Sequence, residues 1–428
     1  MSVLPQKPHE QFIDKYFAFN FTVNVIDGGF FGLGIGFASF VSVIPLFVSS
    51  LTDSAVLIGL IPAIHTAFWQ LPQLLMSKRV SRLRKYKPMV VRLTFHERAP
   101  FLGLALVAWL APSMDTSLTL ALVFLLLIWQ GLGGGITATA WQSMIGKIIP
   151  GDRWGLFYGT QSALLSMLAV PGAILAGRIL ERMDSPLDFT LCFLLASAAI
   201  FFSWIFIALT REDDSDPLQT TPAMESTRKY VGVVLRRDVN FRWFLIVRIL
   251  YQLSLMGIAF YIVYAVRSYG ASEGTAGLLT GLMLVIQILI NPVVGWLGDR
   301  WSHRYIVVCG ALAAFGSALL AWWAGQIGWF FLVFLLAGMA STVNWTTSLA
   351  MLLKFGSESE RPIYIGMANT LIAPFVILAP IFGGWVADTA GYQATFFISA
   401  IFGLITAGVA LFKIQGVRGK DEPLSEII

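Results

Sequence analysis

The chain has 428 residues, of which 57% are hydrophobic and only 12% are charged, with a formal net charge of +5. A typical soluble domain has about 25% charged residues, so this composition excludes an ordinary water-soluble globular protein. The excess apolar surface requires contact with lipid, and the sequence therefore predicts an integral membrane protein.

The apolar residues form twelve segments that are long enough to cross a bilayer as helices. A helix needs roughly 20 mostly apolar residues to cross the ~30 Å hydrocarbon core, and it satisfies its own backbone hydrogen bonds. The segments are far longer than the ~10-residue strands of a membrane β-barrel. In chain order the predicted spans are 18–48, 54–76, 90–111, 117–144, 157–179, 188–210, 241–266, 275–297, 304–325, 328–353, 363–387 and 393–414.

The longest polar stretch, 211–240, separates the first six predicted helices from the last six. We therefore expect an N-terminal six-helix bundle over 1–210 and a C-terminal one over 241–428. The stretch between them is interpreted as a solvated connector rather than an interaction motif. Its basic amphipathic part near 224–237 is predicted to lie along the membrane surface.

The two halves repeat one pattern. Three pairs of residues recur at nearly the same offset in corresponding helices or loops. The pairs are Arg153 and Arg361, Pro171 and Pro380, and Gly131 and Gly338, with offsets of 208, 209 and 207 residues. A parallel repeat of two six-helix bundles is a transporter architecture, with the substrate site near the membrane midplane between the halves.

The positive charges predict the orientation. Most of the 29 Lys and Arg residues fall on the side of the termini and the central linker, while three lie in opposite loops and three within helices. Positive residues mark the cytoplasmic side. We expect both termini to be cytoplasmic in a multi-pass protein of the plasma (inner) membrane. The basic composition then needs no nucleic-acid partner.

The segment Gly295-Trp-Leu-Gly-Asp299-Arg300-Trp-Ser-His-Arg304 resembles the loop signature Gly-x-Leu-x-Asp-Arg-x-Gly-Arg-Arg of the major facilitator superfamily. The resemblance implies an all-α fold of twelve transmembrane helices in two pseudo-symmetric bundles. In that family the loop joins the halves on the cytoplasmic face and helps to hold the outward-open state. Asp299 can bond to a helix N-terminus or to a neighbouring arginine. The predicted gating residues are Gly295, Asp299, Arg300, Arg304, Arg153 and Arg361.

Two features depart from the family pattern. The equivalent loop of the first half, Met76 to Lys85, keeps basic residues but has no Asp. Gln130-Gly-Leu-Gly-Gly resembles the end of a family motif that carries an arginine three residues before the Gln, and here that position is Leu127. In proton-coupled members this arginine is linked to proton movement, so that mechanism does not transfer directly.

Ionisable residues inside predicted helices are functional candidates, because a charge in the bilayer centre costs several kcal/mol unless it is paired or wetted. The candidates for transport or coupling are Asp27, His65, Glu97, Arg98 and Arg248. Polar and aromatic residues at similar depth are candidates for lining a cavity. These are Asn24, Gln130, Gln252, Asn344 and Trp345.

Each candidate has a structural alternative. Asp27 is either a cavity carboxylate that binds a proton or a cationic group, or the partner of Arg98 or of a basic loop residue in a structural ion pair. Glu97 and Arg98 are neighbours and point about 100° apart, so we expect one to face another helix and the other a cavity. Arg248 binds an anionic group, pairs with Asp27 or Glu97, or snorkels to the cytoplasm. His65 is interpreted as a hydrogen-bonded interior residue more readily than as a proton carrier.

Trp345 has two interpretations as well. In a cavity its ring can stack on a sugar or a lipophilic cation, and otherwise it packs or faces lipid. The sequence contains no metal-ligand cluster, nucleotide loop or hydrolase triad, so we predict no enzyme, cofactor or metal.

These features predict a secondary transporter of a small organic solute that works by alternating access. Proton-coupled efflux of an amphipathic compound is the first hypothesis, and import of a sugar-like or anionic metabolite is the second. A non-transporting receptor or scaffold is disfavoured because the loops are short. The expected partners are a small-molecule substrate, the lipid bilayer and, as a candidate coupling ion, the proton, and the chain is expected to be a monomer.

Overall fold

A computed structural model describes residues 8–40, 42–52, 55–214, 227–271, 273–358 and 360–414. This part of the chain consists of helices and helical turns, without strands. The chain divides into two compact units. Unit 1 comprises Met1–Gly151, Leu164–Gln219 and Glu358–Thr370, and unit 2 comprises Asp152–Ala163, Thr220–Ser357 and Leu371–Ile428. Residues 215–226 of the predicted linker lie outside the described residues.

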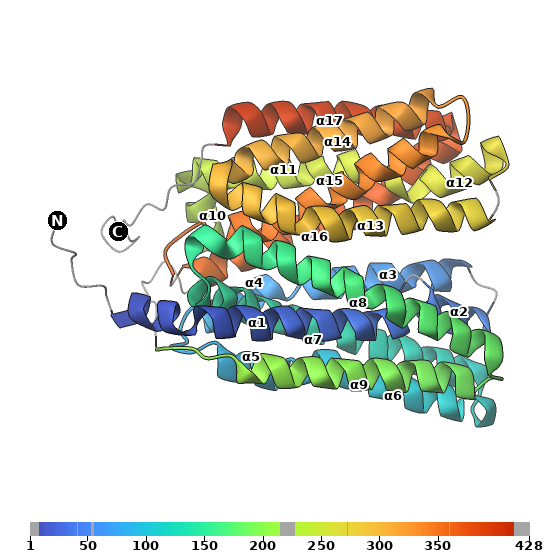
Figure 1. Ribbon diagram of the computed structural model, residues 1–428, viewed down its shortest axis with the longest axis horizontal. Coiled ribbons are helices and arrows are strands. Elements are labelled where there is room, and N and C mark those ends of the chain that lie inside the picture. The colour runs from blue at the N-terminus through green and yellow to red at the C-terminus, as the bar shows by residue number, and fades with distance from the viewer. Residues whose placement is uncertain are drawn as a thin grey trace. The chain divides into compact units, whose positions relative to one another are not determined.

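The helices follow one another along the chain with short connections (Figure 1). The N-terminal half contains α1 (Pro8–Phe37), α2 (Val43–Ser49), α3 (Ala55–Gln70), α4 (Gln73–Val80), α5 (Lys87–Leu93), α6 (Phe95–Leu110), α7 (Thr116–Ile148), α8 (Trp154–Arg182) and α9 (Leu187–Leu209). The C-terminal half contains α10 (Thr227–Arg237), α11 (Val239–Leu255), α12 (Ile258–Tyr269), α13 (Glu273–Leu297), α14 (His303–Trp323), α15 (Trp329–Leu352), α16 (Arg361–Ala390) and α17 (Tyr392–Lys413).

The predicted all-α membrane fold is confirmed, with adjustments to the spans. Among the described residues, eight helical stretches are long and apolar enough to cross a membrane. They contain nine of the twelve predicted segments, because the eighth and ninth fall in one stretch of 46 residues, Leu278–Trp323. At 1.5 Å per residue such a stretch is more than twice the ~30 Å hydrocarbon thickness, which leaves room for two crossings.

The first three predicted segments differ from the expectation because each is divided between two helices: α1 and α2, α3 and α4, and α5 and α6. The second break falls at Leu71 and Pro72. Proline lacks the backbone N–H that a continuous helix needs, which explains this interruption. The seventh segment is also divided, at Met256 and Gly257 between α11 and α12.

The helix contacts repeat between the two halves. In unit 1, α1 packs on α9, α6 packs on α7 and α9, and α3 packs on α7. In unit 2, α11 packs on α17, α14 packs on α15 and α17, and α13 packs on α15. Gly131 and Gly338, one of the predicted repeat pairs, lie in α7 and α15, where they face α3 and α13 respectively. The internal repeat read from three sequence pairs is therefore present in the packing.

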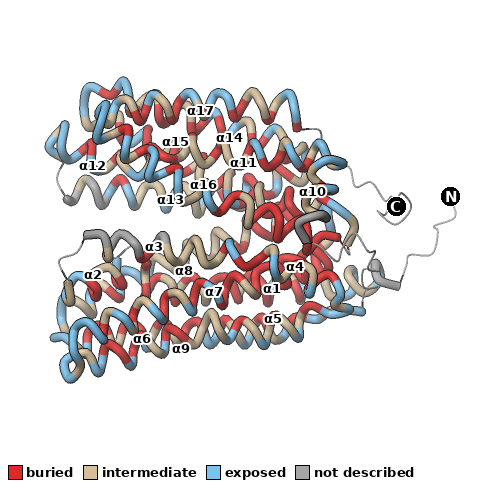
Figure 2. Tube along the Cα trace, turned by 180° about the vertical axis from the view of Figure 1, so that it is seen from behind, coloured by how far each residue is buried: buried red, intermediate tan, exposed pale blue. Residues whose placement is uncertain are grey.

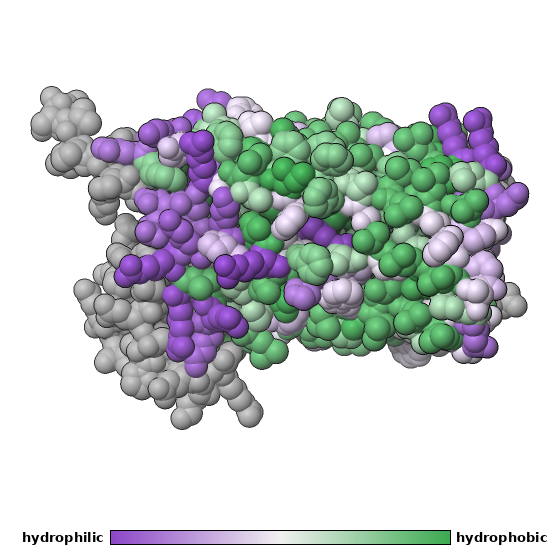
Figure 3. All heavy atoms as spheres, turned by 90° about the horizontal axis from the view of Figure 1, so that it is seen from below, coloured by the Kyte–Doolittle hydropathy of each residue, from purple (hydrophilic) through white to green (hydrophobic). Residues whose placement is uncertain are grey.

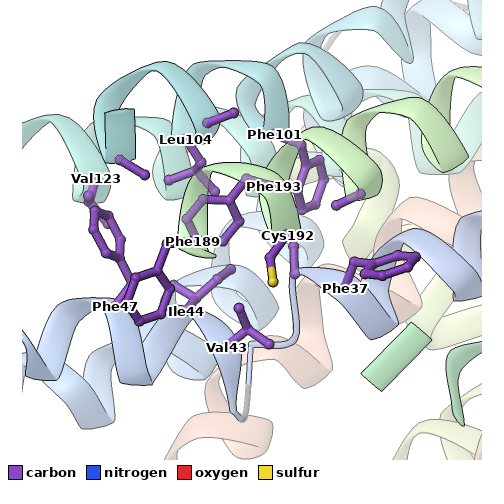
Figure 4. Packing of buried hydrophobic residues seen from close by; sticks show 14 of the residues in the cluster. Phe37, Val43, Ile44, Phe47, Phe101, Leu104, Val123, Phe189, Cys192 and Phe193 are labelled. Carbon is purple, nitrogen blue, oxygen red and sulfur yellow. The ribbon is translucent and has the colours of Figure 1, made fainter. Parts of the chain in front are cut away.

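An apolar core holds together the end of unit 1 near α2. Phe47 of α2 packs against Phe189 and Phe193 of α9, with ring centroids 5.1 and 5.7 Å apart. Phe101 and Leu104 of α6 complete this cluster (Figure 4). Buried residues concentrate on the inward sides of the helices of each unit (Figure 2).

The outward helix faces are apolar as well. Phe201 and Phe202 of α9 are 54% and 51% exposed. On the face shown in Figure 3, hydrophobic residues form a broad belt and hydrophilic residues gather at its two ends. An exposed apolar belt of this extent is expected of a protein that faces lipid.

Candidate functional site

The buried charges of unit 1 meet where α1, α6 and α9 pack together. The Arg98 guanidinium lies 3.4 Å from a carboxylate oxygen of Asp27 and donates to the Ser203 hydroxyl at 3.0 Å. Ser203 in turn donates a 2.6 Å hydrogen bond to the same Asp27 oxygen. The side chains of Arg98 and Asp27 are only 10% and 8% exposed, so they form a buried ion pair.

Glu97 brings a second carboxylate to the same guanidinium. Its Oε2 lies 3.5 Å from Arg98 Nη1, and its side chain is 14% exposed. Arg98 also donates to the Thr94 hydroxyl one turn earlier. We expected Glu97 and Arg98 to point to different neighbours, but the long arginine side chain reaches both carboxylates from its place on α6.

We call Asp27, Glu97 and Arg98 the charge cluster. It contains two carboxylates and one guanidinium, which leaves one negative charge in excess when all three are ionised. A buried charge without a full counter-charge is costly in a low-dielectric interior. The arrangement therefore favours the uptake of a proton or the approach of a cationic group.

Glycines of α7 let α3 and α6 pack closely against α7 beside the charge cluster. A Cβ atom on Gly134 would lie 2.7 Å from Glu97 Oε1 and 2.8 Å from the Trp69 side chain. On Gly133 it would collide with the backbone of His96. Only glycine allows these helix backbones to approach so closely. The Gln130-Gly-Leu-Gly-Gly motif thus has a packing function at this site.

His65 and Gln130 form a second polar contact in unit 1. His65 Nδ1 lies 2.8 Å from Gln130 Oε1, and the imidazole stacks on Phe40 with centroids 4.1 Å apart. Asn24 lies elsewhere on α1, where its Nδ2 donates to the Asn20 carbonyl at 2.8 Å and to Thr210 at 3.1 Å. These hydrogen bonds of His65 and Asn24 thus lead to Gln130, Asn20 and Thr210.

Two of the four candidates of unit 2 lie beside a small cavity. Arg248 of α11 and Asn344 of α15 line a space of about 10 Å³, close to the minimum for one water molecule. The Arg248 guanidinium carbon also lies 5.8 Å from the centroid of the Phe244 ring. Gln252 is half-buried one turn further along α11. Trp345 is 52% exposed, so its ring faces the surface of unit 2.

Asp299 of the predicted gating loop caps a helix. The segment Gly298–Ser302 forms a π-helical turn between α13 and α14. The two Asp299 oxygens accept hydrogen bonds of 3.0 and 2.8 Å from the backbone N–H groups of Gly155 and Leu156, at the start of α8. A carboxylate at a helix N-terminus is favoured by the helix dipole and by the unpaired N–H groups.

The close approach of α8 and α13 makes this bond possible. A Cβ atom on Gly155 would collide with the Gly295 carbonyl oxygen, and one on Gly295 would collide with the Gly155 carbonyl. Because neither glycine has a side chain, the backbones of α8 and α13 can approach each other here. Gly295, the first residue of the family-like signature, therefore has a packing reason that the motif alone does not reveal.

The basic residues that follow Asp299 in the gating loop contact Asp299 itself and neighbouring helices. His303 Nε2 lies 3.6 Å from Asp299, and His303 Nδ1 lies 3.1 Å from Lys354 Nζ. Burial lowers the pKa of Lys354 below its usual value, while the Asp299 carboxylate opposes that shift. Arg304 donates to the Leu411 carbonyl at the end of α17. Arg300 lies over the Trp296 ring, 5.1 Å from its centroid.

In unit 1 the first part of α16 contacts α4 through hydrogen bonds of neutral groups. Asn369 Nδ2 donates to Gln73 Oε1 at 2.7 Å, and the Leu74 N–H donates to the Thr370 hydroxyl at 3.1 Å. Arg361 is 9% exposed at the start of this helix, whereas its repeat partner Arg153 is exposed. The two arginines predicted from the repeat therefore lie in different environments.

The sequence analysis missed a second carboxylate at a helix start. Glu212, just after α9, accepts from the backbone N–H groups of Tyr86 and Lys87 at 2.9 and 2.7 Å, where α5 begins. It also pairs with Lys147 at 3.1 Å, and their side chains are 1% and 0% exposed. Lys147 further donates to the Arg84 and Asp213 carbonyls. The signals available were a lysine in an apolar helix end and an acid directly after an apolar helix.

No group of three His, Cys, Asp or Glu side chains that could hold a metal ion occurs within the described ranges. The site chemistry visible there is that of ion pairs, hydrogen bonds and helix capping.

The comparisons with known proteins agree with this fold. The Major Facilitator Superfamily model matches residues 244–426. The crystal structure of the E. coli fucose:proton symporter FucP matches with a TM-score of 0.71 and 17% identity, over 92% of this chain and 98% of that one. The C-terminal part of the chain thus resembles the Major Facilitator Superfamily in sequence, and the chain shares the fold of this solved transporter.

Other transporters are similar over part or most of the chain. The mouse vesicular acetylcholine transporter is 30% identical over 150 residues, which is 35% of this chain but only 27% of the mouse protein. The human synaptic vesicular amine transporter is 24% identical over 34% of this chain and 29% of its own length. The human organic anion transporter MFSD10 matches in structure with a TM-score of 0.67 and 14% identity, over 95% of this chain and 100% of that one.

Proposed function

We propose that this chain is a major facilitator superfamily transporter that moves a small organic solute by secondary active transport with alternating access, and that proton-coupled efflux is its mode. The observation that carries the proposal is the charge cluster. Its buried carboxylates Asp27 and Glu97 share one guanidinium, so a proton or a cationic solute can complete the charge balance. Loading and release of that positive charge is what a coupled exporter requires.

The helix-capping carboxylate supports the alternating-access part of the proposal. Asp299 bonds to the start of α8, whose first residues belong to unit 2 while Leu164 and the residues after it belong to unit 1. A movement that separates α8 from α13 must break these two hydrogen bonds. Asp299 is therefore suited to favour one conformational state over the other.

The excess negative charge favours a cationic amine among organic solutes. The names of two similar proteins, an acetylcholine transporter and an amine transporter, agree with this choice. A sugar-like or anionic solute is the alternative, and Arg248 of α11 is the group that would meet an anion in a state whose cavity is larger. The two substrate classes make opposite demands on the charge cluster, so they are separable by experiment.

The test is solute flux in proteoliposomes that hold the full chain. A pH gradient is imposed, and organic cations, sugars and organic anions are compared as substrates. We expect gradient-driven movement of organic cations, and loss of the gradient dependence in Asp27→Asn and Glu97→Gln. Absence of flux for all three classes would refute the transporter proposal, and undiminished pH coupling in both variants would remove the charge cluster from the mechanism.

A further inference from the structure

A groove in unit 1 lies apart from the charge cluster and from the gating loop. It has a volume of about 800 Å³ and opens between the first turns of α1, the start of α5 and the end of α9. These elements meet at the left end in Figure 1, and hydrophilic residues gather at that end of the face in Figure 3. The transport proposal does not use this space, whereas Glu212, which caps the start of α5, lies in its lining.

The groove has a cationic side. Lys87, Arg92 and Arg211 line it, together with Lys85. Lys85 pairs with Asp214 at 3.5 Å, but these side chains are 45% and 69% exposed, so the pair is weak. The one carboxylate in the lining, Glu212, is already engaged by Lys147 and two backbone N–H groups. A positive potential therefore remains in the groove.

The groove also has an apolar side. Val91, Leu209 and Phe12 line it next to the cations. Leu209 is the last residue of α9, and the polar sequence Thr210-Arg-Glu-Asp-Asp follows at once. The groove therefore crosses the level at which the apolar helix surface gives way to charge, which is where a lipid headgroup meets its acyl chains.

The cations are held in place by the fold. The Arg211 backbone is fixed by Asn20, which donates to its carbonyl and accepts from its N–H, both at 2.9 Å. The Arg211 guanidinium carbon lies 4.7 Å from the centroid of the Tyr16 ring. The Lys87 N–H is fixed by Glu212. These hydrogen bonds fix the backbone at two of the cationic positions, Arg211 and Lys87.

We propose that this groove binds an anionic phospholipid, with its phosphate against Lys87, Arg92 and Arg211 and an acyl chain along Val91 and Leu209. Basic pockets between transmembrane helices are suited to lipid phosphate groups, and each nearby cation contributes an attraction of about fivefold in affinity. The site is independent of the proposed transport activity, because it shares no residue with the charge cluster or the gating loop.

The test measures lipid binding to the purified full chain by native mass spectrometry and by thermal unfolding. Phosphatidylglycerol, phosphatidylcholine and inorganic phosphate are the probes. The wild-type protein should retain phosphatidylglycerol in preference to phosphatidylcholine and inorganic phosphate. Phosphatidylglycerol should also stabilise it more than the other two probes do. The triple variant Lys87→Gln, Arg92→Gln and Arg211→Gln should lose about 100-fold in phosphatidylglycerol affinity. Equal stabilisation by phosphatidylcholine or by inorganic phosphate would overturn the proposal.

Two further variants keep the test decisive. A control with the same change in net charge carries Arg236→Gln, Arg237→Gln and Arg242→Gln, which lie outside the groove, and it should bind as wild type does. Val91→Trp fills the apolar side without altering charge, and it should weaken phosphatidylglycerol binding about tenfold. If the control loses as much affinity as the groove variant, or if Val91→Trp has no effect, diffuse surface charge explains the binding and the groove does not.

Discussion

Asp299 of unit 2 and Glu212 of unit 1 use the same chemistry at two different helix starts. Each carboxylate accepts hydrogen bonds from two successive backbone N–H groups, Asp299 at the start of α8 and Glu212 at the start of α5. Their ionic partners differ. Glu212 pairs with Lys147 at 3.1 Å, whereas Asp299 lies 3.6 Å from His303, which is charged only when protonated.

This difference in ionic partner distinguishes two kinds of contact. We expect the Glu212 contact to persist, and the Asp299 contact to break and re-form. Lys147 carries three donors and gives them to Glu212 and to the carbonyls of Arg84 and Asp213, so its contact joins three segments. Asp299 has no such fixed cation at hydrogen-bond distance within the described residues. We therefore expect Glu212 to govern stability, and Asp299 to govern the conformational equilibrium.

The largest effect is expected at the permanent contact. Lys147→Met should lower the free energy of unfolding by about 3–5 kcal/mol, because it leaves the Glu212 charge buried without its cation. The measurement is thermal or denaturant unfolding of the purified chain. The double variant Lys147→Met with Glu212→Gln should recover much of the loss. A single variant as stable as wild type would contradict the assignment of a structural ion pair.

The close approach of α8 and α13 should be nearly as sensitive. Gly155→Ala places a Cβ against the Gly295 carbonyl, which cannot move without its helix, so we expect a loss of about 1–3 kcal/mol in stability. Gly177→Ala in the same helix is the control, since a Cβ there meets nothing within 4 Å. It should be neutral or stabilising by up to about 1 kcal/mol. Equal effects at the two positions would argue against the packing role.

Asp299→Asn should reduce solute flux more than it reduces stability. The amide keeps only one acceptor for the α8 start, so we expect stability to fall by about 1 kcal/mol. The solute flux should fall by about tenfold or more, because one conformational state loses hydrogen bonds that stabilise it. Flux and unfolding are measured on the same preparations. The control is Asp184→Asn, which changes an exposed aspartate in the same way. A large loss of stability with normal flux would reverse the roles assigned to Asp299 and Glu212.

The smallest effect is expected at the exposed ion pair beside the buried one. Lys85→Ala removes the partner of Asp214, but both side chains are largely exposed. The expected change in the free energy of unfolding is about 0.5 kcal/mol or less, and it should vanish at high salt. A loss similar to that of Lys147→Met would mean that burial does not distinguish the two pairs.

Several features of the fold and of the site could be predicted from the sequence. Hydropathy predicts the helical membrane class, because each segment must match the hydrocarbon thickness by itself. The Gly-x-Leu-x-Asp-Arg signature drew attention to Asp299, because its spacing is local. The choice between an ion pair and a separate cavity role for Asp27 stayed open in the sequence, because the distance to Arg98 depends on how α1 and α6 pack. The structure places the two charges 3.4 Å apart.

By itself, the sequence determined the membrane class, the two related halves and the family to which the loop signature points. Only the tertiary structure decided which charges meet. Nothing local to Lys147 shows that it ends buried against Glu212, 65 residues later. Nor does the loop after α9 show that its acid caps α5. Hydrophobicity adds up along a segment and can be read there, whereas a charge pair exists only where packing brings two distant segments within a few ångströms.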